Sequence, residues 1–211
     1  MPSGSASPRC TSRGSSAARS TGCARSPRRP SPLVLRRDGE GAVAIGQPSH
    51  AWLSGQLARA WEGVEPREEV CLGAEQHDIG MAEWDLAPSL NEETGLPHSF
   101  MEMPLEVHLE LWAHAARKLV RQSAYAALLV SMHGGALYEM RDFDRMSDAD
   151  AAQVRAFLEE RRAEQEALVA ELGAPRDEVR RNQRLVWTWD FISLALCLDW
   201  APATAERVPL G

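Results

Sequence analysis

The stretch that decides the fold reads Tyr125-Ala126-Ala127-Leu128-Leu129-Val130-Ser131-Met132, and the next residues are His133-Gly134-Gly135. Apolar side chains fill this stretch without the regular gaps that would give a helix one polar face. A helix that is apolar on every side is buried among the other elements of a domain. The stretch therefore predicts a central helix, buried on all sides, that ends at His133-Gly134-Gly135.

Further helices are predicted on both sides of this central segment. Proline suits the first turn of a helix, and Ser147 with Asp150 resembles a capping box. The expected helices run from Pro48 to Gly63, from the residue after Pro66 to His77, from Pro104 through Leu119, from Ser147 to Gly173, and from the residue after Pro175 through Leu198. Two short strands, 33–35 and 42–45, flank a turn that contains glycine, and 81–103 form a long loop. The expected fold is mainly α, with about six helices and a short N-terminal β-hairpin.

The composition fits one folded domain of moderate size. The 211 residues are 44% hydrophobic and 25% charged, which predicts a single domain with a hydrophobic core over residues 33–211. No run approaches the roughly 18–20 apolar residues that cross a bilayer, so we do not expect a membrane-spanning protein. The four cysteines form no Cys-x-x-Cys pair, which favours a reducing compartment, and we expect a cytoplasmic protein.

Charge is distributed unevenly along the chain. Residues 1–37 contain eight arginines and no acidic residue, which leaves 15 basic and 30 acidic residues, a net charge of −15, for 38–211. The acidic body argues against nucleic acid as a partner, because phosphate contacts need clustered cations. Residues 1–32 are rich in Ser, Arg and Pro and predict a disordered tail. Two interpretations of this tail stay open: an inert segment produced by an overlong start, or a targeting or binding segment.

Ionisable side chains occur where the predicted helices are otherwise apolar. Burying an unpaired polar group costs a few kcal/mol, so each of these positions needs a partner. Asp190, between Trp189 and Phe191, is the clearest case, because a buried carboxylate needs a cation or several donors. One metal site would satisfy the whole set, which is His50, His77, Asp78, His108, His133 and Asp190. The expected cofactor is one or two divalent metal ions, chosen from Mn, Fe, Co, Zn and Mg, because imidazole and carboxylate are their ligands.

The order His, His-Asp, His, His, Asp along a helical chain resembles the HD superfamily of metal-dependent phosphohydrolases. The string His77-Asp78-Ile79-Gly80 matches the HDIG form of its signature. The wider pattern is similar to an uncharacterised bacterial domain family near that superfamily, and it comprises Gln47-Pro48-Ser49-His50, residues 129–134 and residues 189–194. The resemblance covers roughly residues 33–205 and implies an HD-like helical bundle.

This resemblance also implies roles for individual residues. A first metal ion would be bound by His50, His77, Asp78 and Asp190, and a second one, bridged by Asp78, would be completed by His108 and His133. The implied activity is hydrolysis of a phosphoester, in a nucleotide or another small phosphorylated molecule, by metal-bound hydroxide. Asp78 is therefore a candidate catalytic residue. Cyclic-dinucleotide phosphodiesterases of the HD-GYP type carry a lysine after HDIG, where this chain has Met81, so we do not expect that substrate.

Two other functions fit the same ligand set. It also resembles that of HD-type di-iron oxygenases, in which iron activates oxygen. A non-catalytic module that senses a metal ion or a nucleotide would keep the helices and the ligands without turnover. These alternatives stay open at the level of sequence.

Three residues outside the ligand set are candidates for contact with a substrate. His98, in the loop 96–99, could donate a proton to a leaving group. Arg141 and Arg145 follow His133 closely and could hold a phosphate group.

Overall fold

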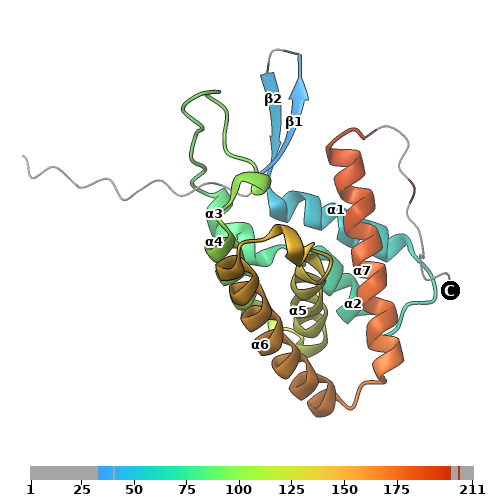
Figure 1. Cartoon of the computed structure of the whole chain (residues 1–211). Helices are drawn as coiled ribbons and strands as arrows, with labels where there is room; N and C mark the ends of the chain where they lie inside the picture. Colours follow the sequence, from blue (N-terminus) through green and yellow to red (C-terminus); the bar gives the residue numbers. More distant parts are fainter. Residues whose placement is uncertain (1–32, 40, 201–203, 205–211) are drawn as a thin grey trace, which may run out of the picture.

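A computed structural model describes residues 33–39, 41–200 and 204, and Figure 1 shows their arrangement. The elements are β1 (Val34–Asp38), β2 (Gly41–Ile45), α1 (Gln47–Ala60), α2 (Arg67–Glu75), α3 (Ala82–Asp85), α4 (Leu105–Leu119), α5 (Ala124–Glu139), α6 (Asp148–Leu172) and α7 (Arg176–Cys197). This order confirms a mainly α fold with a short N-terminal hairpin. None of the described helices is both long enough and apolar enough to cross a membrane. The tail predicted for residues 1–32 lies outside the described residues.

The central position of α5 is confirmed. Figure 1 shows it among the other helices, and it contacts α2, α4, α6 and α7. Residues 125–131 are all buried. Leu128 and Leu129 belong to an apolar core shared with α2 and α7, whereas Ala127 and Val130 belong to a second core shared with α4 and α6. Apolar residues on every side of α5 are therefore explained by two cores that meet at one helix.

The predicted end of this helix at His133-Gly134-Gly135 is wrong, because α5 continues to Glu139. Gly134 stays helical and makes room for Trp112 of α4. A Cβ atom on Gly134 would lie 2.6 Å from Trp112 Cε3, closer than real Cβ contacts. Glycine at this position serves close packing rather than helix termination. His133 consequently lies inside a continuous helix, beside the contact between α4 and α5.

The two neighbouring glycines of α5 lead to opposite predictions for stability. Gly134→Ala should lower the free energy of unfolding by about 1–2 kcal/mol, because overpacking against Trp112 outweighs the better helix propensity of alanine. Gly135→Ala is the matched control, since its Cβ would lie 3.7 Å from Gln165 Nε2, an ordinary contact. It should raise the free energy of unfolding by up to about 1 kcal/mol. Urea denaturation followed by circular dichroism measures both, and equal effects of the two substitutions would contradict the packing argument.

The loop predicted for residues 81–103 is partly helical. It contains α3 and a 3₁₀ turn at Phe100–Glu102. The hairpin fixes the end of this segment, because Leu33 forms a parallel bridge with Ser99 and the Phe100 amide donates to the Leu33 carbonyl oxygen at 3.0 Å. β1 and β2 pair antiparallel, with Val34 opposite Ile45, and β2 leads directly into α1. The hairpin thereby places the 3₁₀ turn beside the beginning of α1, where both line one cavity.

Candidate metal centre

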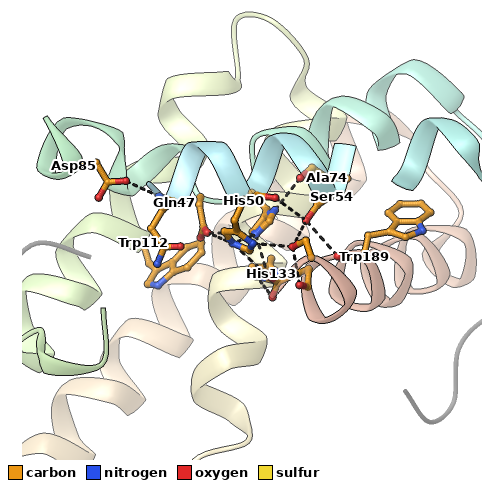
Figure 2. Close-up of polar contacts among 12 residues, drawn as sticks. Gln47, His50, Ser54, Ala74, Asp85, Trp112, His133 and Trp189 are labelled. Carbon is orange, nitrogen blue, oxygen red and sulfur yellow. Dashed lines mark hydrogen bonds and ion pairs between the residues drawn. The ribbon is translucent and has the colours of Figure 1, made fainter. Parts of the chain in front are cut away.

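Two helices and one turn bring four of the predicted ligands together. His50 lies on α1, His77 and Asp78 lie in the turn after α2, and Asp190 lies on α7. One ring nitrogen each of His50 and His77 and one carboxylate oxygen of Asp190 all lie within 4.8 Å of one another. All four side chains are buried. Figure 2 shows His50 and His133 near each other, and each has its Nε2 3.5 Å from an oxygen of Asp190.

The ring of His77 is oriented by a hydrogen bond on its outer side. His77 Nδ1 lies 2.8 Å from the carbonyl oxygen of Ala74. A carbonyl oxygen only accepts, so Nδ1 carries a hydrogen and donates it. In the neutral ring, Nε2 then presents its lone pair to the cluster. This is the arrangement that orients a metal-binding histidine.

Two serines orient His50 in the same way. Ser193 Oγ donates to the carbonyl oxygen of Asp190 at 2.8 Å, so it accepts from His50 Nδ1, which is 2.7 Å away. Ser54 Oγ lies 2.9 Å from Ser193 Oγ and donates to it, and Figure 2 shows Ser54 on the same helix as His50. His50 Nδ1 therefore carries a hydrogen and donates it to Ser193 Oγ. Like His77, His50 turns its Nε2 lone pair toward the cluster.

The atoms that face one another inside the cluster are acceptors. His50 Nε2 lies 2.7 Å from Asp78 Oδ2 and 3.2 Å from His77 Nε2. Asp190 Oδ1 lies 3.3 Å from His77 Nε2 and 3.5 Å from His50 Nε2. Buried imidazole lone pairs and carboxylates repel one another unless a proton or a metal ion lies among them. This donor set fits one divalent cation.

Charge in the metal-free centre is balanced by protons. Burial alone would lower the pKa of His77, but the carboxylates of Asp78 and Asp190 outweigh it and raise this pKa well above the usual value. Burial would raise the pKa of each carboxyl group, yet the imidazole of His77 holds both pKa values below the usual range. The metal-free centre therefore has two carboxylates and an imidazolium at His77. A metal ion would replace that proton.

His133 lies at the edge of this group. Its Nε2 is 3.5 Å from Asp190 Oδ2, and its Nδ1 has no hydrogen-bond partner among the described residues. The ring centroid lies 5.7 Å from that of Trp112 and 5.4 Å from that of Trp187. Burial lowers the pKa of His133 to about 4, so the ring is neutral at pH 7. His133 therefore lies between two tryptophan rings and the cluster, with its Nδ1 unpartnered among the described residues.

The structure does not bring His108 and His98 into the group. Both ring nitrogens of His108 are engaged, by Tyr138 Oη at 2.6 Å and by Trp112 Nε1 at 3.0 Å. His98 Nδ1 lies 3.4 Å from Glu102 Oε1. His98 is absent from the lining of the cavity beside the centre, to which Phe100 of the same loop contributes. Among the described residues, the group that could hold a metal ion is the one around His50, His77 and Asp190, and the roles expected of His108 and His98 stay predictions.

A family model described as a protein of unknown function, DUF3891, matches residues 33–209. The match spans the hairpin, every described helix and all residues of the candidate centre. The chain belongs to the DUF3891 family. No curated protein and no solved structure matches it. The expectation of an uncharacterised domain family is confirmed.

Sequence reasoning missed the residues that orient the ligands of this DUF3891 chain. Ser54 follows His50 by four positions and Ser193 follows Asp190 by three, so each serine shares a helix face with a ligand. That spacing is a usable signal for a hydroxyl beside a metal-binding side chain. The pairing of Tyr138 with His108 spans 30 positions and leaves no such signal in a single sequence.

The hydrogen bond to His50 predicts a measurable loss of metal affinity. Ser193→Ala should weaken Mn²⁺ binding to this DUF3891 protein by about 10- to 100-fold, because the acceptor that fixes the His50 ring is lost. Ser131→Ala is the control: Ser131 is equally buried but its hydroxyl bonds Gln165 on α6, so affinity should not change. Isothermal titration calorimetry measures both. Equal affinity of the Ser193→Ala variant and wild type would refute the orienting role.

Proposed function

We propose that this DUF3891 chain is a metal-dependent phosphohydrolase of HD type, with one divalent cation bound by His50, His77, Asp78 and Asp190. The observation that carries the proposal is the orientation of the two imidazoles. Hydrogen bonds on their outer nitrogens leave both Nε2 atoms facing buried carboxylates. The order of these residues along the chain, which resembles that of the HD superfamily, supports the same conclusion. The mixed imidazole and carboxylate set favours Mn, Fe, Co or Zn.

A cavity beside the centre supplies a place for the substrate. It has a volume of about 230 Å³, and its lining includes His50, Asp78 and Asp190 together with Arg141. A larger cavity of about 320 Å³ between α5, α6 and α7 contains none of the candidate ligands. The smaller cavity is the proposed substrate site, because the chemistry needs the substrate next to the carboxylates and imidazoles.

Hydrolysis of a phosphomonoester breaks the bond between phosphorus and the ester oxygen, and the oxygen of water forms the new bond to phosphorus. One hydrogen of that water moves to the leaving oxygen and the other stays on phosphate. The chemistry that a divalent cation supplies when bound is a lower pKa for water and partial neutralisation of the phosphoryl charge. Asp78 lines the cavity as well as the centre, so its carboxylate is placed to orient the attacking water by accepting a hydrogen bond from it. Arg141 adds positive charge at the cavity.

Phosphate release tests this proposal. Purified protein supplied with Mn²⁺ is expected to release phosphate from members of a panel of phosphomonoesters and phosphodiesters. Asp78→Ala should abolish both release and stoichiometric metal content by elemental analysis. Asp144→Ala is the control, because Asp144 is an exposed carboxylate in the turn after α5 and should leave both unchanged.

Three outcomes would overturn the phosphohydrolase proposal. Iron bound as purified, with oxygen uptake and no phosphate release, would favour an oxygenase. Tight binding of a phosphorylated ligand without product would favour a sensing module. A wild-type protein without metal, unaffected by Asp78→Ala, would remove the metal centre itself.

A further inference from the structure

The cavity beside the metal centre has one polar end and one apolar wall. The apolar wall includes Phe100, Met101, Met103, Leu105, Leu137 and Leu194, and Met81 and Trp112 also line the cavity. Besides the candidate metal ligands, the lining also includes Tyr138 and Arg141 at the C-terminal end of α5 and His108 of α4. These polar side chains determine which group of a ligand can lie against the centre.

The hydrogen bonds around His108 determine where the hydrogen of Tyr138 goes. Trp112 Nε1 lies 3.0 Å from His108 Nε2, and an indole nitrogen can only donate, so Nε2 accepts. The ring is then neutral with its hydrogen on Nδ1, which agrees with a pKa of His108 that burial lowers to about 4. His108 Nδ1 donates that hydrogen to Tyr138 Oη at 2.6 Å. The hydroxyl hydrogen of Tyr138 takes no part in this bond and is available to an acceptor in the cavity.

Arg141 supplies the positive charge next to this hydroxyl. Its guanidinium carbon lies 5.6 Å from the centroid of the Tyr138 ring. Among the described residues, no carboxylate forms an ion pair with Arg141, whereas Arg145 pairs with Asp142 at 3.2 Å. The charge of Arg141 is therefore uncompensated at the cavity. One cation and one hydroxyl donor match the oxygens of a single phosphoryl group.

The size and the wall of the cavity restrict the rest of the ligand. Its volume of about 230 Å³ falls below the roughly 300–1,000 Å³ typical of pockets for drug-sized molecules. A nucleotide needs several polar partners for its ribose and base. Gln47, whose Oε1 has no hydrogen-bond partner among the described residues, is the only amide side chain in the lining, and the Nε1 of Trp112 is already bonded to His108. A nucleoside di- or triphosphate would also bring more negative charge than one arginine balances.

We infer that the substrate is a compact phosphomonoester with an apolar organic group, whose phosphoryl oxygens are held by Arg141 and Tyr138. His108 acts as a positioning residue, since it directs the Tyr138 hydroxyl through its own hydrogen bond. The apolar wall takes the organic group of the ester. This inference rests on the proposed function, because the phosphoryl group must lie against the metal centre.

The first test compares two probes, phenyl phosphate and adenosine 5′-monophosphate, on the full chain supplied with Mn²⁺. Calorimetry measures binding, and phosphate release measures turnover. We expect phenyl phosphate to bind. Its kcat/KM should be at least about tenfold higher than that of the nucleotide, because a tenfold ratio corresponds to the free energy of one favourable interaction. Arg141→Met should weaken phenyl phosphate binding by about 10- to 100-fold, as expected for a hydrogen bond to a charged group. Arg145→Met is the control and should bind as wild type does.

A double-mutant cycle tests the positioning role of His108. Tyr138→Phe should weaken phenyl phosphate binding by about tenfold or more. His108→Gln should act in the same direction, but should add little in the Tyr138→Phe background, because both changes remove the same donated hydrogen bond. A merely structural role of His108 would instead give additive effects. Arg141→Met carries the test if either of these variants fails to fold.

The outcomes separate this inference from the proposed function. Binding of phenyl phosphate that depends on Arg141, without any hydrolysis, would support the ligand class and overturn the phosphohydrolase. Hydrolysis of adenosine 5′-monophosphate in preference to phenyl phosphate would support the phosphohydrolase and overturn the ligand class. If neither probe binds, or if Arg141→Met and Tyr138→Phe bind as wild type does, the inference is wrong.

Discussion

Replacing Asp190 with asparagine is expected to remove nearly all of the stability that a divalent metal ion adds to this protein. A ligand that binds only the folded state raises the free energy of unfolding by about 4 kcal/mol at a concentration roughly 1,000 times its Kd. Asp190 contributes one of three ligand atoms that lie within 4.8 Å of one another, and a neutral amide cannot replace its charge. Urea denaturation in Mn²⁺ and in a chelator gives the metal-dependent increment directly.

The metal-free variant should stay folded, which makes the loss specific to the metal. Two carboxylates share the imidazolium at His77 in the metal-free centre, and Asp190→Asn leaves one carboxylate, Asp78, paired with that charge. The asparagine side chain also keeps the shape of the aspartate that it replaces. The control is Asp144→Asn, which makes the same charge change on the surface and should keep the full increment. If Mn²⁺ raises the free energy of unfolding of Asp190→Asn as much as that of wild type, the metal ion binds outside this centre.

The helical fold could be predicted because the patterns that specify it are local. Prolines at helix starts, the N-cap serine Ser147, whose hydroxyl accepts from the Asp150 amide, and the apolar stretch 125–132 each act within a few residues. The predicted end of α5 was wrong because its cause is not local. Glycine is common just after the end of a helix, but here Gly134 lies inside α5 and accommodates Trp112, which lies 22 positions earlier in the sequence and packs against it in space. No single-sequence pattern distinguishes a terminating glycine from one that gives room to a distant side chain.

The difference between local and distant causes also separates the residues of the candidate site that could be predicted from those that could not. His50, His77, Asp78 and Asp190 could be predicted as buried ionisable residues because each lies in or beside an apolar segment, where burial demands a partner. The resemblance to the HD superfamily, rather than burial, grouped these four as the ligands of one metal ion. His108 met the same criterion, yet its partners are Tyr138 and Trp112. Burial explains why a polar residue needs a partner but does not specify which one. Only the packing of α4 against α5 decides that His108 bonds a tyrosine.

Raising the pH should weaken the metal-free protein while leaving the metal-bound protein unaffected. In the metal-free centre Asp78 and Asp190 hold the pKa of His77 well above its usual value. A raised pKa in the folded state gives stability that is complete below the unfolded pKa, about 6.5, and is lost as pH rises toward the folded pKa. Between pH 7 and pH 8 the free energy of unfolding in a chelator should therefore fall by up to about 1.4 kcal/mol.

Metal binding should show the opposite dependence, because the metal ion displaces the proton of His77. Its apparent affinity should rise by up to about tenfold per pH unit over the same range. The two effects cancel in the metal-bound protein, in which neither the folded nor the unfolded state holds that proton. His133 does not interfere, since burial lowers its pKa to about 4 and its contribution changes only below about pH 6.5.

Chemical denaturation at pH 7 and pH 8, in chelator and in saturating Mn²⁺, measures how the free energy of unfolding changes with pH in the metal-free and in the metal-bound protein. His77→Gln is the control, because glutamine is uncharged at both pH values and should give a metal-free protein whose stability no longer falls. A metal-free slope that persists in His77→Gln would assign the titration to another group. Equal slopes with and without Mn²⁺ in the wild type would mean that the metal ion does not compete with a proton on His77, and that its imidazole is not a ligand.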